Sequence, residues 1–389
     1  MKTVVLKFGG TSLQTFDLRR KVITIIKERL EQNLFPVVVV SAFGRKGDPY
    51  ATDSLLNLLP SNSSVRHKAM ISACGEIISA SIIAEQLKRN KIPAIALTGW
   101  QAGLLTNSHY QKAEVKLLDI CNIEKELSRN IVPVICGFQG INKSGEITTL
   151  GRGGSDTTAA IIARAIKAKR LELFKDVDGV YTADPQLVKS ARRIKSLSYH
   201  EISELAGNGA KIVHDPSIME LADKEIPIIL GSTYSGKQGT CIQPKNKSRI
   251  INAVTSKRNL ILITINISAN ERLSEIFNEF ADHEISIDFI NVDQYHVSFV
   301  IDESKASIAE NILNILNLRN NMQSKFSKIT AIGSGMTGRP GVMAKLSTAL
   351  EANGIKIEMA TDSYSTISFL VPEKFEILAL NSIHKSFDL

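Results

Sequence analysis

The first part of the chain alternates short apolar runs with longer stretches in which apolar positions recur at a helical spacing. Six runs have the length and composition of buried strands: Thr3 to Phe8, Pro36 to Ser41, Pro93 to Thr98, Val132 to Cys136, Leu171 to Lys175 and Pro227 to Leu230. Amphipathic helices are predicted between them at Leu13 to Gln32, Val65 to Arg89 and Asp156 to Lys167. This alternation predicts a mostly parallel sheet sandwiched by helices, with ligands beyond the carboxyl ends of the strands.

A different texture begins near residue 231, where a polar, glycine-bearing connection follows the last of these strands. After it the order strand, helix, strand, strand, helix occurs twice, at residues 260–316 and 328–387. The period of roughly 70 residues indicates a duplicated small α+β domain of the pattern βαββαβ. Each copy should end in another strand, but the sequence stops just after the last helix, so we expect residues 250–255 to supply the missing edge strand to the second copy and thread the two copies together. The predicted domains are 1–245, 246–324 and 325–389.

Composition places the chain among ordinary globular proteins, with 43% hydrophobic and 22% charged residues. No uninterrupted apolar run approaches the roughly 20 residues of a membrane-spanning helix, and Lys7 interrupts the N-terminal apolar stretch too early for a signal peptide. The four cysteines are far apart and lie outside any zinc-ligand spacing. We therefore expect a cytoplasmic protein with no membrane partner, no disulfide framework and no structural metal.

The net charge of +8 is unevenly distributed: residues 1–257 carry +13 and residues 258–389 carry −5. The basic residues of the first part are scattered, without a dense run or interleaved aromatic residues. A nucleic-acid partner is therefore not expected, and a small anionic substrate fits the positive charge as well.

The segment Lys7-Phe8-Gly9-Gly10-Thr11-Ser12 lies where the first predicted strand ends and the first helix begins. Two glycines let the backbone approach a phosphate closely, and a helix N-terminus offers unpaired N–H groups. A tight turn also needs glycine without any ligand, so the glycines alone are weak support. Lys7 strengthens the hypothesis, because a lysine that ends an apolar strand is costly to bury unless it meets an anion.

A second glycine-rich segment, residues 148–158, also opens a predicted helix. Arg152 could hold a carboxylate through two hydrogen bonds, and Ser155 could bond to the same ligand. Asp156 either caps this helix or orients Lys7 across the site. Gly75-Glu76 is expected to open a helix, where Glu76 either caps the helix or binds a ligand ammonium group.

A third segment, residues 175–185, follows the fifth predicted strand. Its Asp-Gly and Asp-Pro pairs are ordinary turn formers and prove little by themselves. Tyr181 could pack on a purine, and a loop of this length at a sheet edge is often functional.

Together these segments resemble the aspartokinases (aspartate kinases) of the amino-acid kinase family, and the match runs through nearly the whole chain. The motifs that carry the resemblance occur in the family's order: KFGGTS at 7–12, Val39 to Ala42, Gly75-Glu76, TLGRGGSDTTA at 149–159, DVDGVYTADP at 176–185 and Gly209-Ala210-Lys211. The turn at 333–342 resembles the second of two ACT regulatory domains, and the loop at 44–53 resembles the monofunctional, homo-oligomeric type. The resemblance implies the amino-acid-kinase fold followed by two ACT domains.

The resemblance also implies a reaction: transfer of the γ-phosphoryl group of ATP to L-aspartate, giving 4-phospho-L-aspartate and ADP, the first step towards lysine and diaminopimelate, threonine and methionine. The implied catalytic residues are Lys7 and Asp156, and the implied aspartate-binding residues are Ser41, Thr52, Glu76, Arg152 and Ser155. The implied ATP-binding residues are Lys7, Gly9, Gly10, Lys175, Asp176, Tyr181, Asp184 and Lys211. Mg²⁺ would bridge the phosphates, held by them and by water, so no protein ligands to the metal are expected.

This chain departs from the family's usual residues at Lys175, Gln186 and Asp215-Pro216-Ser217, all on the nucleotide side. In the first repeat, Asn270-Glu271-Arg272 stands where a Pro-Gly turn is usual. The duplicated region still implies feedback by an amino acid, lysine or diaminopimelate ahead of threonine, and a homodimer through the ACT domains, or a tetramer. Two alternatives stay open: another phosphotransferase of this fold, acting on glutamate, a nucleoside monophosphate or carbamate, and a non-catalytic amino-acid sensor.

Overall fold

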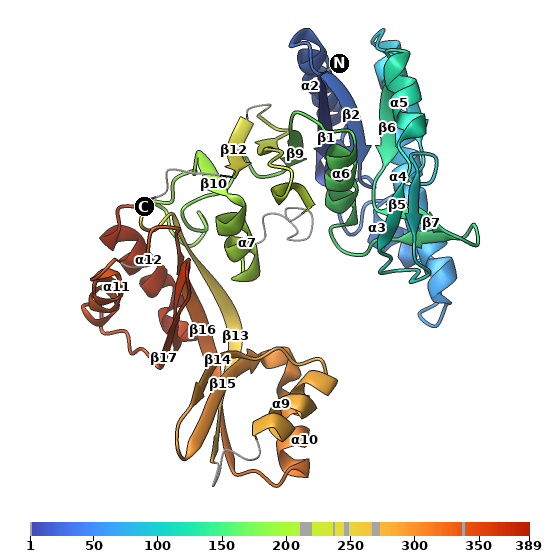
Figure 1. Cartoon of the computed structure of the whole chain (residues 1–389). Helices are drawn as coiled ribbons and strands as arrows, with labels where there is room; N and C mark the ends of the chain where they lie inside the picture. The colour runs from blue at the N-terminus through green and yellow to red at the C-terminus, as the bar shows by residue number, and fades with distance from the viewer. Residues whose placement is uncertain (1, 211–219, 236–237, 245–248, 267–272, 337–338) are drawn as a thin grey trace. The chain divides into compact units, whose positions relative to one another are not determined.

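The computed structural model describes residues 2–210, 220–235, 238–244, 249–266, 273–336 and 339–389 (Figure 1). The chain forms two compact units, which are described separately. The first unit contains Met1–Val180, Arg193–Ala206 and Lys211–Asn246, and the second contains Tyr181–Arg192, Gly207–Ala210 and Lys247–Leu389. The division thus falls between Asn246 and Lys247, but two short earlier segments, which the sequence assigned to the first domain, belong to the second unit.

The main sheet of the first unit has, among the described residues, eight strands in the order β10-β12-β11-β9-β1-β2-β6-β3. All neighbours are parallel except β11 and β12, so the predicted mostly parallel sheet is confirmed. The strands are β1 (Thr3–Phe8), β2 (Phe35–Val40), β3 (Ala94–Leu97), β6 (Val132–Cys136), β9 (Leu171–Lys175), β10 (Ser196–Ser198), β11 (Ile228–Ser232) and β12 (Gln238–Gln243). The six strands predicted from apolar runs are all present, within two residues at each end.

Helices cover both faces of this sheet (Figure 1). The helices are α1 (Gly10–Leu13), α2 (Phe16–Glu31), α3 (Thr52–Leu56), α4 (Val65–Arg89), α5 (Cys121–Ser128), α6 (Gly154–Ala165) and α7 (Tyr199–Gly207). Residues Val4, Leu6 and Phe8 of β1 pack in one core with side chains of α2 and α4. Since side chains alternate along a strand, Val5 and Lys7 point to the other face, where α6 contacts β1 and β9.

One buried ion pair joins α2 to the main sheet. Arg29 donates from Nε and Nη2 to the carboxylate of Glu172 on β9 at 2.9–3.0 Å. Arg29 is 3% exposed and Glu172 is 1% exposed. Arg170 also pairs with Glu172 at 2.7 Å, and Glu28 lies 3.5 Å from Arg29, so the buried charges are compensated within a small network.

A second, smaller sheet was not predicted. Among the described residues it has four strands in the order β5-β4-β7-β8. They are β4 (Leu104–Thr106), β5 (Val115–Leu118), β7 (Gln139–Asn142) and β8 (Ile147–Thr149). Strands of three or four residues are too short for an alternating pattern to stand out in a sequence.

Helix α4 is the one helix, of those described, that is long and apolar enough to cross a membrane. Half of its most apolar stretch is buried inside the protein, and it packs against β3, β6 and β8. These contacts are those of a core helix.

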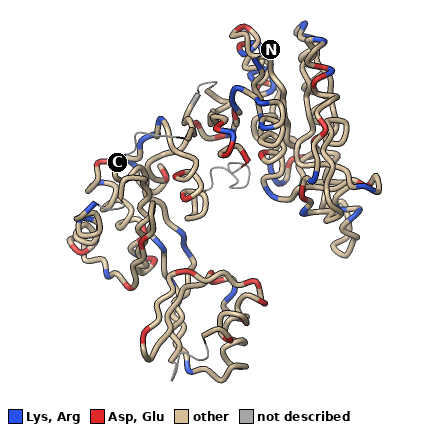
Figure 2. The backbone as a smooth tube through the Cα atoms, viewed as in Figure 1, with Lys and Arg blue, Asp and Glu red and all other residues tan. Residues whose placement is uncertain are grey.

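In the same unit, Lys and Arg residues are scattered along the backbone without a dense run (Figure 2).

The second unit is built on one antiparallel sheet. As far as the structure describes it, the sheet has six strands in the order β14-β15-β13-β16-β18-β17. The strands are β13 (Ala253–Asn266), β14 (Asp288–Val292), β15 (His296–Asp302), β16 (Asn320–Ile332), β17 (Met359–Asp362) and β18 (Thr366–Pro372). The helices are α9 (Leu273–Asp282), α10 (Ala306–Ile315), α11 (Val342–Glu351) and α12 (Glu376–Ser386), with 3-10 turns at Glu303–Lys305 and Glu373–Phe375.

The two long strands, β13 and β16, pass through both repeats. Residues 262–265 of β13 pair with 320–323 of β16 in the first repeat, beside the core that α9 and α10 cover. Residues 253–257 pair with 328–332 in the second repeat, beside the core that α11 and α12 cover. Along the sequence, the first repeat is therefore inserted between two segments of the second repeat.

The segment Tyr181–Arg192 packs against the second repeat and is hydrogen-bonded to helix α12. The ring of His384 on α12 makes two hydrogen bonds to it: Nε2 lies 2.8 Å from the Thr182 hydroxyl and Nδ1 lies 3.2 Å from the Ser190 hydroxyl. His384 is 2% exposed. Burial lowers the pKa of His384, and the positive charge of Arg192 acts in the same direction.

Candidate active site

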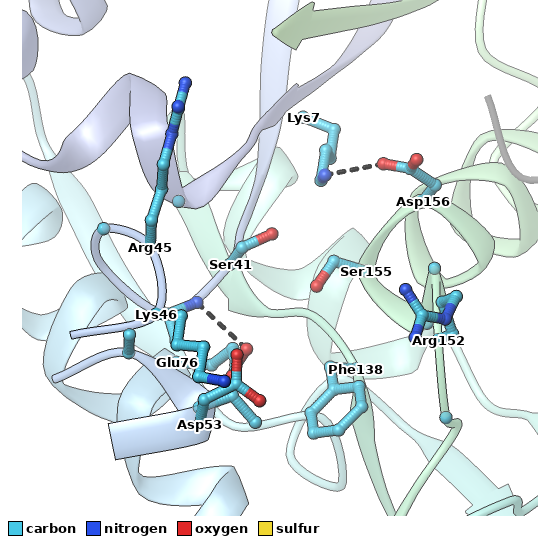
Figure 3. Close-up of a pocket in the computed structure, with 18 residues that line it drawn as sticks. Lys7, Ser41, Arg45, Lys46, Asp53, Glu76, Phe138, Arg152, Ser155 and Asp156 are labelled. Carbon is cyan, nitrogen blue, oxygen red and sulfur yellow. Dashed lines mark hydrogen bonds and ion pairs between the residues drawn. The ribbon is translucent and has the colours of Figure 1, made fainter. Parts of the chain in front are cut away.

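A cavity of about 520 Å³ opens in the first unit at the carboxyl ends of β1 and β2 (Figure 3). Its wall brings together eight residues that the sequence singles out: Lys7, Gly10, Ser41, Thr52, Glu76, Arg152, Ser155 and Asp156. They come from β1, the start of α1, the loop after β2, α3, α4, the turn before α6 and the start of α6. The two glycine-rich segments, nearly 150 residues apart in the chain, thus line one cavity.

An ion pair between Lys7 and Asp156 crosses one side of the cavity (Figure 3). The Lys7 Nζ lies 2.6 Å from Asp156 Oδ1, and both side chains are less than a tenth exposed. A second ammonium, that of Lys175, lies 3.2 Å from Asp156 Oδ2. Burial alone would raise the pKa of Asp156, but the charges of Lys7 and Lys175 outweigh it and lower the pKa to about 2. Asp156 is therefore ionised at any physiological pH.

Strand register explains why two lysines meet one carboxylate. Lys7 of β1 pairs with Leu173 of β9. Lys175 lies two residues beyond Leu173, so its side chain points to the same face of the sheet as that of Lys7. Helix α6 covers this face, and Asp156 stands in its first turn.

The turn before α6 settles one alternative for Asp156. Helix α6 begins at Gly154, and its N-cap is Gly153, with a left-handed φ of 74° that a residue bearing a Cβ rarely adopts. Asp156 is thus not the N-cap of α6, and its carboxylate faces the two lysines instead. Arg152, in the same turn, lines the cavity and has no ion-pair partner within the part of the chain that the structure describes.

Glu76 occupies a different place from the one predicted. It lies in the middle of α4, which begins at Val65 behind a Ser64 cap, so Gly75-Glu76 does not open a helix and cannot cap one. Glu76 Oε1 accepts a hydrogen bond of 2.9 Å from the Ala42 amide, while Oε2 has no hydrogen-bond partner among the described residues. Burial raises the pKa of Glu76 to about 8, although the Ala42 hydrogen bond and the charge of Lys7 oppose the rise.

The glycines after β1 differ in their surroundings. A Cβ on Gly10 would lie 2.5 Å from the Ala42 carbonyl oxygen and 2.6 Å from that of Gly44, so only glycine fits there. A Cβ on Gly9 would meet nothing nearer than 3.6 Å. Gly10 lines the cavity, whereas Gly9 is absent from its wall.

The nucleotide-side residues are only partly gathered by the structure. Lys175 reaches Asp156, and Asp176 pairs with Arg45 at 2.7 Å. Tyr181 and Asp184 belong to the second unit, and Lys211 lies outside the described residues.

Four further polar or aromatic residues line the cavity that the sequence did not single out as site residues: Arg45, Lys46, Asp53 and Phe138. Arg45 and Lys46 belong to the loop after β2, and Asp53 lies in the first turn of α3, which follows that loop. Phe138 follows β6. The rule that ligands bind beyond the carboxyl ends of strands could have indicated all four.

Comparison with known proteins agrees with this geometry. Residues 2–232 match the Amino acid kinase family, and residues 329–387 match the ACT domain. The chain is therefore a member of the amino acid kinase family with a C-terminal ACT domain. It is 36% identical to aspartokinase 1 of Bacillus subtilis (strain 168) and 33% identical to the aspartokinase of Geobacillus stearothermophilus, with at least 98% of every chain covered. Within that family it belongs to the aspartokinases.

Solved structures have the same fold. E. coli aspartokinase III in complex with lysine and aspartate (T-state) is 25% identical, with a TM-score of 0.78 and 100% of both chains covered. Clostridium acetobutylicum aspartate kinase is 23% identical, with a TM-score of 0.81 over 99% of this chain and 100% of that one. The predicted family is confirmed, as is an amino-acid-kinase fold followed by a C-terminal ACT domain.

Proposed function

We propose that this chain transfers the γ-phosphoryl group of ATP to the side-chain carboxylate of L-aspartate, giving 4-phospho-L-aspartate and ADP. The observation that carries the proposal is the single cavity lined by Lys7, Asp156, Arg152 and Glu76. Of these four residues, Lys7 and Arg152 offer an ammonium and a guanidinium to anionic groups, and Glu76 offers a carboxyl group to an ammonium. Arg45, Lys46 and Asp53 add two positive charges and one negative charge to the same wall. A zwitterionic acceptor that carries an extra carboxylate matches this set of charges.

The chemistry needs positioning more than proton transfer. The acceptor carboxylate is already ionised at neutral pH and needs no general base. Phosphoryl transfer then depends on aligning like charges and neutralising them. In the proposed mechanism Lys7 stabilises the moving phosphoryl group, Asp156 orients Lys7, and the Gly9 and Gly10 amides contact the phosphates.

The aspartate side of the cavity is proposed to recognise the amino-acid head group. Arg152 and Ser155 would bind the α-carboxylate, and Glu76 would bind the ammonium group. Ser41 and Thr52 would add polar contacts. The absence of an ion-pair partner for Arg152 among the described residues supports this role, because its charge is available to a ligand.

The nucleotide side is proposed to include Lys175, Asp176, Tyr181, Asp184 and Lys211. Magnesium would bridge the phosphates and be held mainly by phosphate oxygens and water. The donor set fits this arrangement: both Asp156 oxygens face lysines, and no three His, Cys, Asp or Glu side chains cluster in the described ranges.

The second unit is proposed to regulate the first. Lysine or diaminopimelate, ahead of threonine, would bind to the ACT repeats and weaken catalysis through its differential affinity for two states. The repeats would form a homodimer, or a tetramer, and the protein would work in the cytoplasm on the route to lysine, threonine and methionine. The T-state complex of E. coli aspartokinase III with lysine supports an amino-acid effector.

A coupled ADP-release assay with aspartate, with glutamate and without acceptor tests the proposal. ADP release that depends on aspartate is expected. Release with another acceptor would indicate a different phosphotransferase of this fold, and none with any acceptor would indicate an amino-acid sensor. Both outcomes would refute the proposed activity.

Lys7→Met is the matching variant. It should lower kcat by about 10³-fold, the scale of losing one preorganised charge at the transition state. Lys27→Met on α2 is the control, because Lys27 is 68% exposed and pairs only weakly with Glu31. Lys7→Met activity equal to that of the control would remove Lys7 from the mechanism.

A further inference from the structure

The carboxylate of Asp156 has one lysine on each oxygen. Lys7 from β1 lies 2.6 Å from Oδ1, and Lys175 from β9 lies 3.2 Å from Oδ2. The Asp156 side chain is 7% exposed, and that of Lys175 is 23% exposed. One ammonium group would be enough to compensate the negative charge of this buried carboxylate, and here there are two.

The second ammonium group matters because, in the proposed reaction, Lys7 has to interact with two anions: Asp156 and the transferred phosphoryl group. In the structure the Lys7 ammonium is committed to Asp156, yet it also lines the cavity where phosphoryl transfer would occur. An incoming phosphoryl group would draw the ammonium of Lys7 away from Oδ1. With Lys7 as its only partner, Asp156 would then be a buried charge without compensation, and such a charge strongly opposes the movement.

Lys175 removes this opposition by its position. It approaches the other carboxylate oxygen from the neighbouring strand, so it does not have to move when Lys7 moves. The adjacent charged pair, Arg45 with Asp176, is separate from it: Arg45 Nη2 lies 2.7 Å from Asp176 Oδ2. The contact between Lys175 and Asp156 can therefore persist through the reaction.

We infer that Lys175 is a positioning residue of the phosphoryl transfer: it holds Asp156 through the second oxygen and so frees Lys7 to turn towards the phosphoryl group. This inference rests on the proposed function, and it assigns Lys175 a duty beyond contact with the nucleotide. Lys175 acts through Asp156, so its effect should vanish when Asp156 loses its charge.

A double-mutant cycle in kcat tests this coupling, with Lys175→Met, Asp156→Asn and the double variant of the full chain. Lys175→Met should lower kcat roughly 10- to 100-fold, the factor for losing one hydrogen bond to a charged group, with little change in the KM for aspartate. In the Asp156→Asn background the same change should lower the residual kcat less than about twofold. Lys175→Arg, which keeps the charge, should retain most of the wild-type kcat.

Arg45→Met is the control for removing a nearby cation, because Arg45 pairs with Asp176 and not with Asp156. Its effect on kcat should multiply with that of Asp156→Asn. Melting temperatures of all variants separate misfolding from lost function.

Three results would overturn the inference: a Lys175→Met effect that multiplies with Asp156→Asn, a raised KM for ATP with unchanged kcat, or a lowered melting temperature with unchanged kinetics. The second would make Lys175 a direct nucleotide ligand, and the third would make it a purely structural residue. If the wild-type protein released no ADP with aspartate, the proposed function would fail instead, so the two failures are distinguishable.

Discussion

Replacing Glu76 by glutamine should make the free energy of unfolding less dependent on pH. At low pH, where Glu76 is protonated, the two proteins should differ little. Glu76 is 2% exposed, one carboxylate oxygen accepts from the Ala42 amide, and the other has no hydrogen-bond partner among the described residues. Burial therefore favours the protonated form in the ligand-free protein. Glutamine has nearly the same shape and is neutral at every pH.

The magnitude follows from the raised pKa of Glu76, about 8 in the folded protein against an ordinary 4.5. A folded-state pKa above the unfolded one means that the folded state binds the proton more tightly. The stabilisation is complete below pH 4.5 and is lost as the pH rises to 8. Between pH 6 and pH 8 the free energy of unfolding should fall by about 2 kcal/mol for this reason alone.

Urea unfolding of the wild-type protein and the Glu76→Gln variant at pH 6, 7, 8 and 9 measures this difference. The variant should gain about 2 kcal/mol relative to wild type between pH 6 and pH 8, then stay level. Glu85→Gln is the control on the same helix, since Glu85 is 58% exposed, and its difference from wild type should not vary with pH. Aspartate should stabilise the wild type more at pH 8 than at pH 6, because its ammonium group favours the ionised carboxylate.

The reasoning would be refuted if the free energies of unfolding of wild type and Glu76→Gln depended on pH in the same way. This result would mean that Glu76 is ionised in the free protein, and that water or a cation compensates it. The proposed contact between Glu76 and the aspartate ammonium would then need no proton release.

Three further predictions concern other parts of the molecule. Gly10→Ala should lower both activity and stability, because its Cβ would meet two carbonyl oxygens within 2.6 Å. Gly9→Ala should fold normally, because its Cβ would meet nothing nearer than 3.6 Å. Circular dichroism and the ADP assay measure both variants, and equal behaviour would contradict the importance of close approach at Gly10. Glu172→Gln should cost about 3 kcal/mol in urea unfolding, because it removes the carboxylate that both Arg29 and Arg170 contact and leaves the buried Arg29 only the longer, 3.5 Å contact with Glu28. A loss below about 1 kcal/mol would show that Glu28 or water compensates Arg29. The pKa of His384 is lowered by burial, so its contribution to stability is present above its ordinary pKa and lost as the pH falls; the melting temperature of wild type should drop more between pH 7 and pH 5 than that of His384→Gln, and equal drops would contradict this.

The main sheet could be predicted because buried parallel strands leave continuous apolar runs. The ends of β1, β6 and β9 were predicted to the residue from those runs. The strands of the small sheet carry three or four residues each, too few for a period to appear. Their existence depends on the packing of the main domain against them.

The candidate site was predictable in its glycines and charges but not in its pairings. One pairing is an exception: the contact of Lys7 with Asp156 was one of the two alternatives that the sequence offered for Asp156, and the structure has it. That Lys175 shares the same carboxylate depends on the register of β9 beside β1, which the sequence leaves undetermined. The position of Glu76 was wrong because a glycine was interpreted as a helix start, whereas Gly75 lies inside α4 and makes room for close packing.

The path of β13 and β16 has a consequence for how the second unit assembles. The strand pair that closes the second repeat joins residues 253–257 to 328–332, and the intervening chain is the whole first repeat. When the first repeat folds, it brings its own two ends together, which replaces a long flexible loop by a short one and reduces the entropy lost on closing the outer pair. The connectivity thus favours one order of assembly, inner repeat before outer, and the outer repeat can be completed during synthesis only after the chain through α12 has left the ribosome.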